Sequence, residues 1–220
     1  MEKVIAGSSR RGLFATVLLL GMLAGCAGPT ANVDSNYVIT PDASTGLLVG
    51  SVEYRGPLSG YKVYYRGLDN AQQGYFEAGV GMMIIPIPPK SDFQDKKGTL
   101  QVVELPAGNY EIGNWSVKSG YATISQTQPF SIRFVIEPGK ATYIGSFVFT
   151  ATSTLGLTVT GVQVDFTEAF ASDSAVLRER YPTLADTDIF MGVERDFVKK
   201  DVGGQGSLGW KIPPLFMPIY

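Results

Sequence analysis

The residue types that most often carry catalysis are scarce in this chain. It has no histidine and a single cysteine, Cys26. The lack of histidine removes the commonest general base, the Ser-His-Asp and Cys-His mechanisms, and histidine-based zinc, copper or iron sites. We therefore expect a protein that is not an enzyme and that needs neither a cofactor nor a metal.

Two pairs of carboxylates remain as candidates for acid-base chemistry. They are Asp165 with Glu168, and Asp186 with Asp188. Glycoside hydrolysis needs only two such groups several ångströms apart, so a carboxylate-dependent glycosidase stays an alternative. We favour solvated charges at strand and loop ends, because acidic side chains are mostly exposed. A calcium loop starting at Asp186 is excluded, because Phe190 stands where a third ligand is needed and no glutamate follows at the required spacing.

Aromatic side chains offer a second kind of site, a platform on which sugar rings of a glycan or of peptidoglycan could stack. Trp115 and Tyr121 are the leading candidates for this platform. Other aromatic residues in the same part of the chain could join them if they share an exposed face: Tyr61, Tyr64, Tyr65, Tyr75 and Phe76. The alternative is that these side chains pack in the core or at sheet edges, as aromatic residues in strands more often do.

The N-terminus has the three parts of a secretory signal. Basic residues, among them Lys3 and Arg11, precede an apolar run over residues 13–23, which ends in small residues. This run is too short to span a bilayer, which needs roughly 20 apolar residues. We expect a signal peptide over residues 1–25.

The end of this signal, Leu23-Ala24-Gly25-Cys26, resembles the lipobox of bacterial lipoproteins. The resemblance implies cleavage before Cys26 and attachment of lipid to its thiol, so that the membrane is a partner through that lipid. Ala27 follows instead of the aspartate associated with retention at the inner membrane, which implies the outer membrane, with the domain facing the periplasm. The alternative, an ordinary secreted protein, would leave Cys26 as a lone thiol in an oxidising compartment.

Composition and charge limit which fold and which partners the rest of the chain can have. A chain of this length, with 45% hydrophobic residues, can build one core without disulfides. The formal net charge is −2, and nothing in it indicates binding to nucleic acid.

Residues 26–45 are rich in Pro, Thr, Ala, Asn and Ser and predict a lipidated, flexible tether. We assign residues 46–170 to a β-sandwich and residues 171–220 to a helix and an extended appendage.

The predicted fold is mainly β, a single antiparallel β-sandwich. Residues 130–136 alternate, with Phe130, Ile132, Phe134 and Ile136 on one buried face. Glycines at 113 and 161 interrupt the alternation and predict bulges. The predicted strands cover residues 47–54, 61–66, 82–87, 100–105, 110–117, 130–136, 142–149 and 157–166.

Turn motifs support the same fold. Leu105-Pro106-Ala107-Gly108-Asn109 predicts a tight hairpin, and Glu137-Pro138-Gly139-Lys140 predicts a type II turn. The runs VVELPAGNYEIGNWSV and FSIRFVIEPGKATYIGSFVF, which contain these turns, resemble the paired hairpins of transthyretin-like or carboxypeptidase-regulatory-like β-sandwiches of envelope lipoproteins. The resemblance covers residues 46–150. It implies a binding, spacing or assembly module and little about activity.

The last part of the chain has a different pattern. Residues 172–181 carry a capping residue, good helix formers and a following proline, so they predict one short helix. The final 11 residues are apolar and interrupted by prolines, which favours an extended tail. This tail either packs on the sandwich or docks to an envelope protein partner through these side chains: Trp210, Leu215, Phe216 and Tyr220.

A similar choice applies to residues 80–89, which are apolar on both alternating faces and contain three prolines. Prolines lack the N–H that a central strand needs, so this run belongs at a sheet edge. The edge is either covered by the protein's own tail, which we favour, or offered to a partner. The leading interpretation is an outer-membrane lipoprotein that acts as a non-enzymatic binding or assembly module, and the alternative is a glycan- or peptidoglycan-binding protein or a glycosidase.

Overall fold

The computed structural model of this chain describes residues 28–41, 43–80, 90–184, 187, 189–193 and 196–210. Several predictions from the sequence concern residues outside these ranges and are not reached by the structure. They are the lipobox and lipidation site (Leu23, Ala24, Gly25 and Cys26), the strand at 82–87, the pair Asp186 and Asp188, and the tail residues Leu215, Phe216 and Tyr220.

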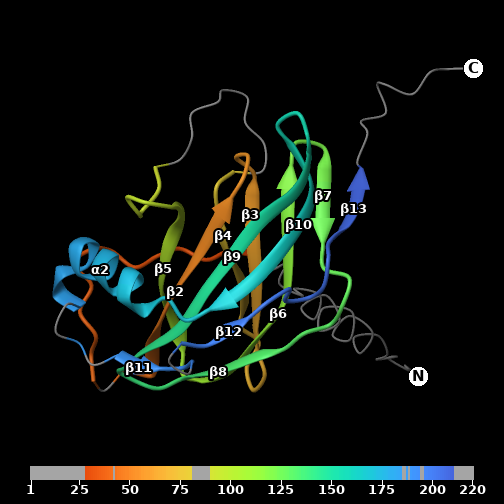
Figure 1. Cartoon of the computed structure of the whole chain (residues 1–220). Helices are drawn as coiled ribbons and strands as arrows, with labels where there is room; N and C mark the ends of the chain where they lie inside the picture. The colour runs from red at the N-terminus through yellow and green to blue at the C-terminus, as the bar shows by residue number, and fades with distance from the viewer. Residues whose placement is uncertain are drawn as a thin grey trace, which may run out of the picture.

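Two sheets packed face to face make up the described part of the chain (Figure 1). Sheet A has the order β1-β4-β3-β6-β7-β13, with β8 also pairing with β6. Its strands are β1 (Gly28–Pro29), β3 (Gly60–Gly67), β4 (Gln73–Ala78), β6 (Gly108–Ser119), β7 (Ala122–Ser125), β8 (Ile132–Ile136) and β13 (Ser207–Trp210). The strand pattern thus produces the predicted mainly β sandwich.

Sheet B has the order β12-β10-β9-β2-β5, with β11 also pairing with β9. Its strands are β2 (Thr45–Arg55), β5 (Lys97–Pro106), β9 (Ala141–Leu155), β10 (Thr158–Thr167), β11 (Ile189–Met191) and β12 (Val198–Lys199). The predicted sandwich is antiparallel throughout, whereas three strand pairs in the structure are parallel. These pairs are β2 with β9, β11 with β9, and β1 with β4. Strands β4 and β7 were not foreseen in the sequence.

The main core lies between the two sheets and is rich in aromatic side chains. Trp115 is fully buried at its centre, and its ring meets that of Phe149 edge to face at 6.0 Å. The bulge predicted at Gly113 is confirmed by a register shift between β3 and β6, and the one at Gly161 by a shift between β9 and β10. The first bulge lets both Ile112 and Trp115 point inward across the break in alternation.

A second core lies on the other face of sheet B. The helix α2 (Phe170–Arg180) and the 3-10 turn η2 (Pro182–Leu184) cover it, with Val176, Leu177 and Leu184 buried. Because sheet B is covered on both faces, nine successive residues of β2 are buried. The helix predicted at 172–181 is confirmed, but it forms a third layer instead of an appendage (Figure 1). It is too short to cross a membrane, and no helix among the described residues could do so.

The segment predicted as a flexible tether also packs on this second core. Asn32 pairs with the β5 backbone, donating to Leu100 O at 3.0 Å and accepting from Val102 N at 3.0 Å. Partly buried Val33, with Tyr37 and Ile39, contacts the core cluster. The prediction of a flexible tether is therefore wrong over residues 30–41. Its apolar residues lack a regular period, so the sequence did not reveal that they are buried.

Both predicted turns connect one sheet to the other. The run at 105–109 is not a hairpin, because β5 belongs to sheet B and β6 to sheet A. The run at 137–140 joins β8 of sheet A to β9 of sheet B, and Gly139 has the positive φ of 64° that a type II turn requires. Turn chemistry specified the local bend, while the two layers of the sandwich decided where the chain goes next.

The C-terminal part also belongs to the sandwich. Strand β12 pairs with β10, and β13 pairs with β7. Between them Val202 is buried, and its carbonyl accepts a hydrogen bond of 2.6 Å from the Trp115 indole nitrogen. The predicted boundary at residue 170 therefore does not separate two structural units.

Candidate functional site

The outer face of sheet A carries three rows of paired side chains. The strand register places Gln73, Arg66 and Glu111 in one row and Tyr75, Tyr64 and Asn114 in the next. A third row holds Glu77, Lys62 and Ser116. Because alternate residues of a strand face opposite sides, each row consists of the outward partners of side chains in the main core.

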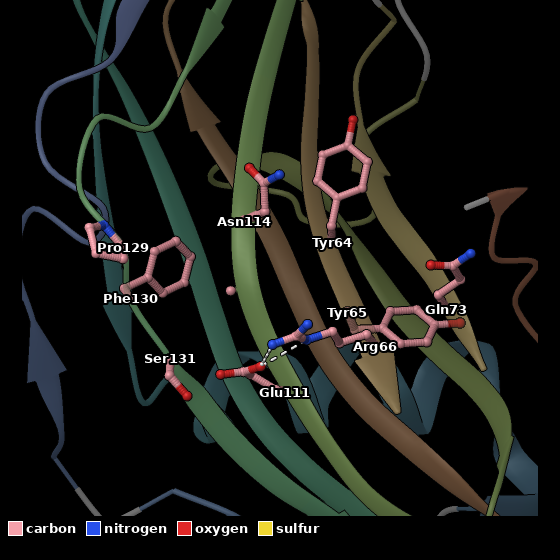
Figure 2. A pocket seen from close by; sticks show the side chains of 10 residues that line it. Tyr64, Tyr65, Arg66, Gln73, Glu111, Asn114, Pro129, Phe130 and Ser131 are labelled. Carbon is pink, nitrogen blue, oxygen red and sulfur yellow. Dashed lines mark hydrogen bonds and ion pairs between the residues drawn. The ribbon is translucent and has the colours of Figure 1, made fainter. Parts of the chain in front are cut away.

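A groove of about 810 Å³ opens beside these rows (Figure 2). Its floor is β3 and β6, and the segment 129–131 before β8 forms one wall. The bulge at Gly113 lies in the floor and leaves a stretch without a side chain. The lining residues are Tyr64, Tyr65, Arg66, Gln73, Glu111, Gly113, Asn114, Pro129, Phe130 and Ser131.

An ion pair crosses the floor of the groove. Arg66 donates to Glu111 Oε2 from Nε at 2.9 Å and from Nη2 at 2.7 Å. A hydrogen bond from Ser131 and then the pair with Arg66 lower the pKa of Glu111 below its ordinary value of 4.5. Glu111 is therefore held as a carboxylate and is unsuited to act as a general acid near neutral pH.

Tyrosine side chains occupy the row next to this ion pair. The rings of Tyr64 and Tyr75 have centroids 5.5 Å apart and are tilted by 53°. The Tyr64 hydroxyl shares a hydrogen bond of 3.1 Å with Ser116 Oγ, and Lys62 Nζ lies 4.0 Å from the centre of the Tyr75 ring. Aromatic surface beside fixed polar groups is the usual composition of a ligand site.

The acidic residues of the groove bear on the glycosidase alternative. Glu111 is the one carboxylate among its lining residues. Glycoside hydrolysis by the common mechanisms needs a second carboxyl group across the scissile bond. Within the described ranges no group of three or more acidic or cysteine side chains is placed to hold a metal ion.

The aromatic platform predicted at Trp115 and Tyr121 does not form. Trp115 is fully buried in the core, whereas Tyr121 is 53% exposed at the turn between β6 and β7. Tyr61, Tyr65 and Phe76 are also buried, so the members of the predicted set on the outer face are Tyr64 and Tyr75. The bulge at Gly113 is the reason, since it turns Trp115 inward with Ile112.

The carboxylates Asp165 and Glu168 hold the backbone of the C-terminal part. Asp165 Oδ1 accepts from the backbone nitrogen of Asp201 at 3.0 Å and from the Gln163 side chain at 2.9 Å. Glu168 accepts from the backbone nitrogens of Phe170 and Asp196. Both carboxylates therefore have a structural role, since each accepts backbone hydrogen bonds that hold the chain after β10.

Of the residues predicted to dock a partner, Trp210 is within the described part of the chain. It ends β13, pairs with Ala122 of β7, and is 49% exposed. Leu208 of the same strand is 38% exposed. Some apolar surface is therefore open at this edge of sheet A.

Comparisons with known proteins add little to this description. The chain matches no protein-family model, and no curated protein matches it. A leucine-rich repeat protein of known structure from Bacteroides thetaiotaomicron is similar over 48% of this chain and 14% of its own length. The identity is 14% and the TM-score is 0.26, a likeness too weak to carry an argument.

Proposed function

We propose that this chain is a lipid-anchored, non-enzymatic binding or assembly module of the bacterial outer membrane, facing the periplasm. The groove on the outer face of sheet A is its binding site for another envelope component. The observation that carries the proposal is the fixed Arg66–Glu111 pair beside the Tyr64–Tyr75 row, with no second carboxylate among the lining residues. Such a groove can recognise a polar ligand but lacks the groups that would cleave it.

The connection between anchor and domain supports a position close to the membrane. Ala27 alone separates Cys26 from β1, which pairs with β4 at the edge of sheet A. An extended chain spans at most about 3.6 Å per residue, so lipid on Cys26 would hold this edge near the headgroups. Pro29 of β1 pairs with Tyr75 of β4, so the first described strand lies next to the tyrosine row.

The anchor is tested by labelling the producing cells with radioactive palmitate. We expect label on the wild-type protein and none on Cys26→Ser. An unlabelled wild type, or a Cys26→Ser variant that keeps its label, would show that the chain is not a lipoprotein. This result is independent of what the groove binds.

The binding role is tested by affinity purification from detergent-solubilised envelope. We expect defined envelope components to co-purify with the wild type and to be lost on Arg66→Ala. A chain truncated after Gly209 tests the alternative contact through Trp210 and the residues that follow. Components lost on truncation and kept on Arg66→Ala would move the binding site to the C-terminal tail.

Glycan binding is the second candidate function, and the half-buried tyrosine row, Tyr64 and Tyr75, favours it. Sugar rings stack their C–H faces on aromatic side chains, while planar polar groups such as Arg66 and Asn114 bond their hydroxyls. We expect the protein to be retained on insoluble peptidoglycan and Tyr64→Ala to lose retention. Tyr121→Ala is the matched control, because Tyr121 is exposed and lies outside the groove. Equal loss in both variants, or no retention of the wild type, would argue against a glycan in the groove.

A further inference from the structure

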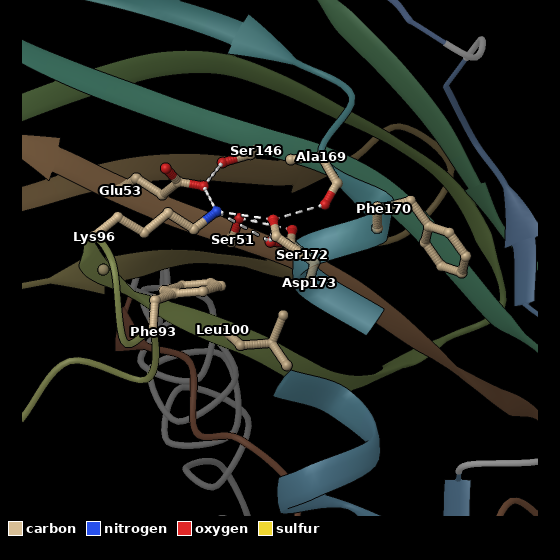
Figure 3. A network of polar contacts seen from close by, with 12 residues as sticks. Ser51, Glu53, Phe93, Lys96, Leu100, Ser146, Ala169, Phe170, Ser172 and Asp173 are labelled. Atoms are coloured by element: carbon tan, nitrogen blue, oxygen red, sulfur yellow. Dashed lines mark hydrogen bonds and ion pairs between the residues drawn. The ribbon is translucent and has the colours of Figure 1, made fainter. Parts of the chain in front are cut away.

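A buried cluster of polar side chains lies between α2 and sheet B (Figure 3). At its centre is Asp173, whose side chain is fully buried. Its Oδ2 accepts hydrogen bonds from Ser51 Oγ at 2.8 Å and from the Tyr143 hydroxyl at 2.9 Å. Its Oδ1 lies 3.8 Å from Lys96 Nζ. One oxygen is thus held by two donors, and the other faces an amine.

A second carboxylate stands on the other side of the amine. Lys96 Nζ lies 2.5 Å from Glu53 Oε1, which also accepts a hydrogen bond of 2.9 Å from Ser146 Oγ. Glu53 is itself buried, and its oxygen is oriented by Ser146. Lys96 Nζ also donates to Ser172 Oγ at 2.9 Å and lies 4.2 Å from the centre of the Phe93 ring. The amine is therefore placed between a carboxylate that can take its proton and a carboxyl carbon that it can attack.

The surroundings favour the neutral form of Asp173. Burial is the main cause that raises the pKa of Asp173 to about 6, against the opposing hydrogen bond from Ser51 and the charge of Lys96. A fraction of Asp173 is therefore protonated near neutral pH. The buried Phe93 ring and Leu100 side chain lie beside the site, while the Lys96 side chain is 22% exposed (Figure 3). Burial of the Asp173 carboxyl among apolar side chains favours condensation over hydrolysis.

We propose that Lys96 and Asp173 condense to form an isopeptide bond, with Glu53 as the proton carrier. Glu53 takes a proton from Nζ, and the free amine attacks Cγ of Asp173. The negative charge on the tetrahedral carbon's Oδ2 is held by the hydroxyls of Ser51 and Tyr143, as in an oxyanion hole. Glu53 returns this proton to Oδ1 and then carries a second proton from the nitrogen to the same oxygen. Oδ1 leaves as water while Oδ2 re-forms its double bond to carbon, so the C–O bond is replaced by a C–N bond.

The reaction balances without an oxidant, a reductant or another reactant. The starting ammonium group carries three protons, of which one stays on the amide nitrogen and two leave with Oδ1 as one molecule of water. Glu53 ends in the ionised form in which it began. The product is a neutral amide, so the buried charges of Lys96 and Asp173 disappear together.

The bond would join two elements that are distant in the chain. Lys96 directly precedes β5, and Asp173 lies in the first turn of α2. A covalent link at this point would hold the helix on the second core, because it restricts the unfolded chain as a disulfide does. The chain's one cysteine is the predicted lipidation site and has no second cysteine to pair with, so this link would provide a covalent brace where the chain cannot form a disulfide.

The purified full-length protein tests the proposal by mass spectrometry under denaturing conditions. We expect a mass lower by one water molecule than that calculated for the processed chain without the bond, and a tryptic digest in which the Lys96 and Asp173 peptides are joined. Lys96→Arg and Glu53→Gln should each have the full mass, the second because it keeps both reacting groups and loses the proton carrier. Lys97→Arg is the matched control and should keep the deficit, since Lys97 Nζ reaches the carbonyl of Gly56 instead.

Two outcomes would overturn the proposal. A wild-type protein with its full mass shows that Lys96 and Asp173 remain a non-covalent pair, and this result needs no variant to fold. A deficit that persists in Lys96→Arg shows that water is lost elsewhere in the chain.

Discussion

The Tyr110 hydroxyl donates a hydrogen bond of 2.8 Å to the carbonyl oxygen of Pro106, four residues earlier in the chain. Tyr61 makes the same contact with Pro57 at 2.7 Å. Each pair stands where the chain leaves sheet B and enters sheet A, so each tyrosine closes a crossing between the layers. This is the geometry of the tyrosine corner of Greek-key sandwiches.

Removing either hydroxyl should destabilise the fold without changing its shape. We expect Tyr110→Phe and Tyr61→Phe each to lower the free energy of unfolding by about 1 kcal/mol, because each leaves a carbonyl without its partner. Urea denaturation followed by fluorescence measures the change. Tyr121→Phe is the control and should leave the midpoint unchanged, and equal effects at all three positions would contradict a special role for the corners.

The buried hydroxyl of Tyr61 should make the stability of the protein depend on pH in alkali. Burial is the main cause that raises the pKa of Tyr61 to about 12, from an ordinary value of 10.0. A group whose pKa is higher in the folded state contributes stability that is fully present below 10.0 and is lost as the pH rises through about 12. We expect cooperative unfolding in this window, measured by circular dichroism together with phenolate absorbance. Full ionisation of the tyrosines in a protein that remains folded would contradict this prediction.

Gly203 lies against the central tryptophan and should not accept a side chain. Its φ is +82°, and an added Cβ would lie 2.6 Å from Trp115 Nε1. Gly120 has a similar φ of +61° and nothing within 4 Å, so Gly120→Ala measures backbone strain alone. We expect Gly203→Ala to lower the free energy of unfolding by about 1–3 kcal/mol more than Gly120→Ala does, as overpacking typically costs. Chemical denaturation of the two variants side by side measures this difference.

The carboxylate in the groove should titrate at unusually low pH. Ser131 and Arg66 both favour its ionised form, so Ser131→Ala and Arg66→Gln should each raise the pKa of Glu111 towards 4.5. The stability that these contacts contribute is present above 4.5 and is lost as the pH falls through the depressed pKa. Carbon NMR of the Glu111 carboxyl measures the titration. An unaltered pKa in both variants would mean that neither contact persists in solution.

Local sequence patterns determined many individual elements of this protein. Alternation within 130–136 and the glycines at 113 and 161 foretold a strand and two bulges that are present in the structure. The sequence also predicted a helix at 172–181, and the structure has it at 170–180. These features depend on backbone propensities and on a period within a few residues, which the sequence displays directly.

Only the tertiary structure decided which layer each element joins and what each side chain faces. The turn at 105–109 could close a hairpin or cross between sheets with the same local conformation, and the second sheet selects the crossing. The sequence leaves open whether Trp115 faces solvent or the core. In the structure the bulge beside it turns it inward, and Val202, far along the chain, accepts its indole hydrogen bond. The pairs Arg66–Glu111 and Lys96–Asp173 join residues far apart in sequence, and no local pattern connects them. Their proximity comes from the packing of strands and layers, because burial and contact are properties of the whole fold.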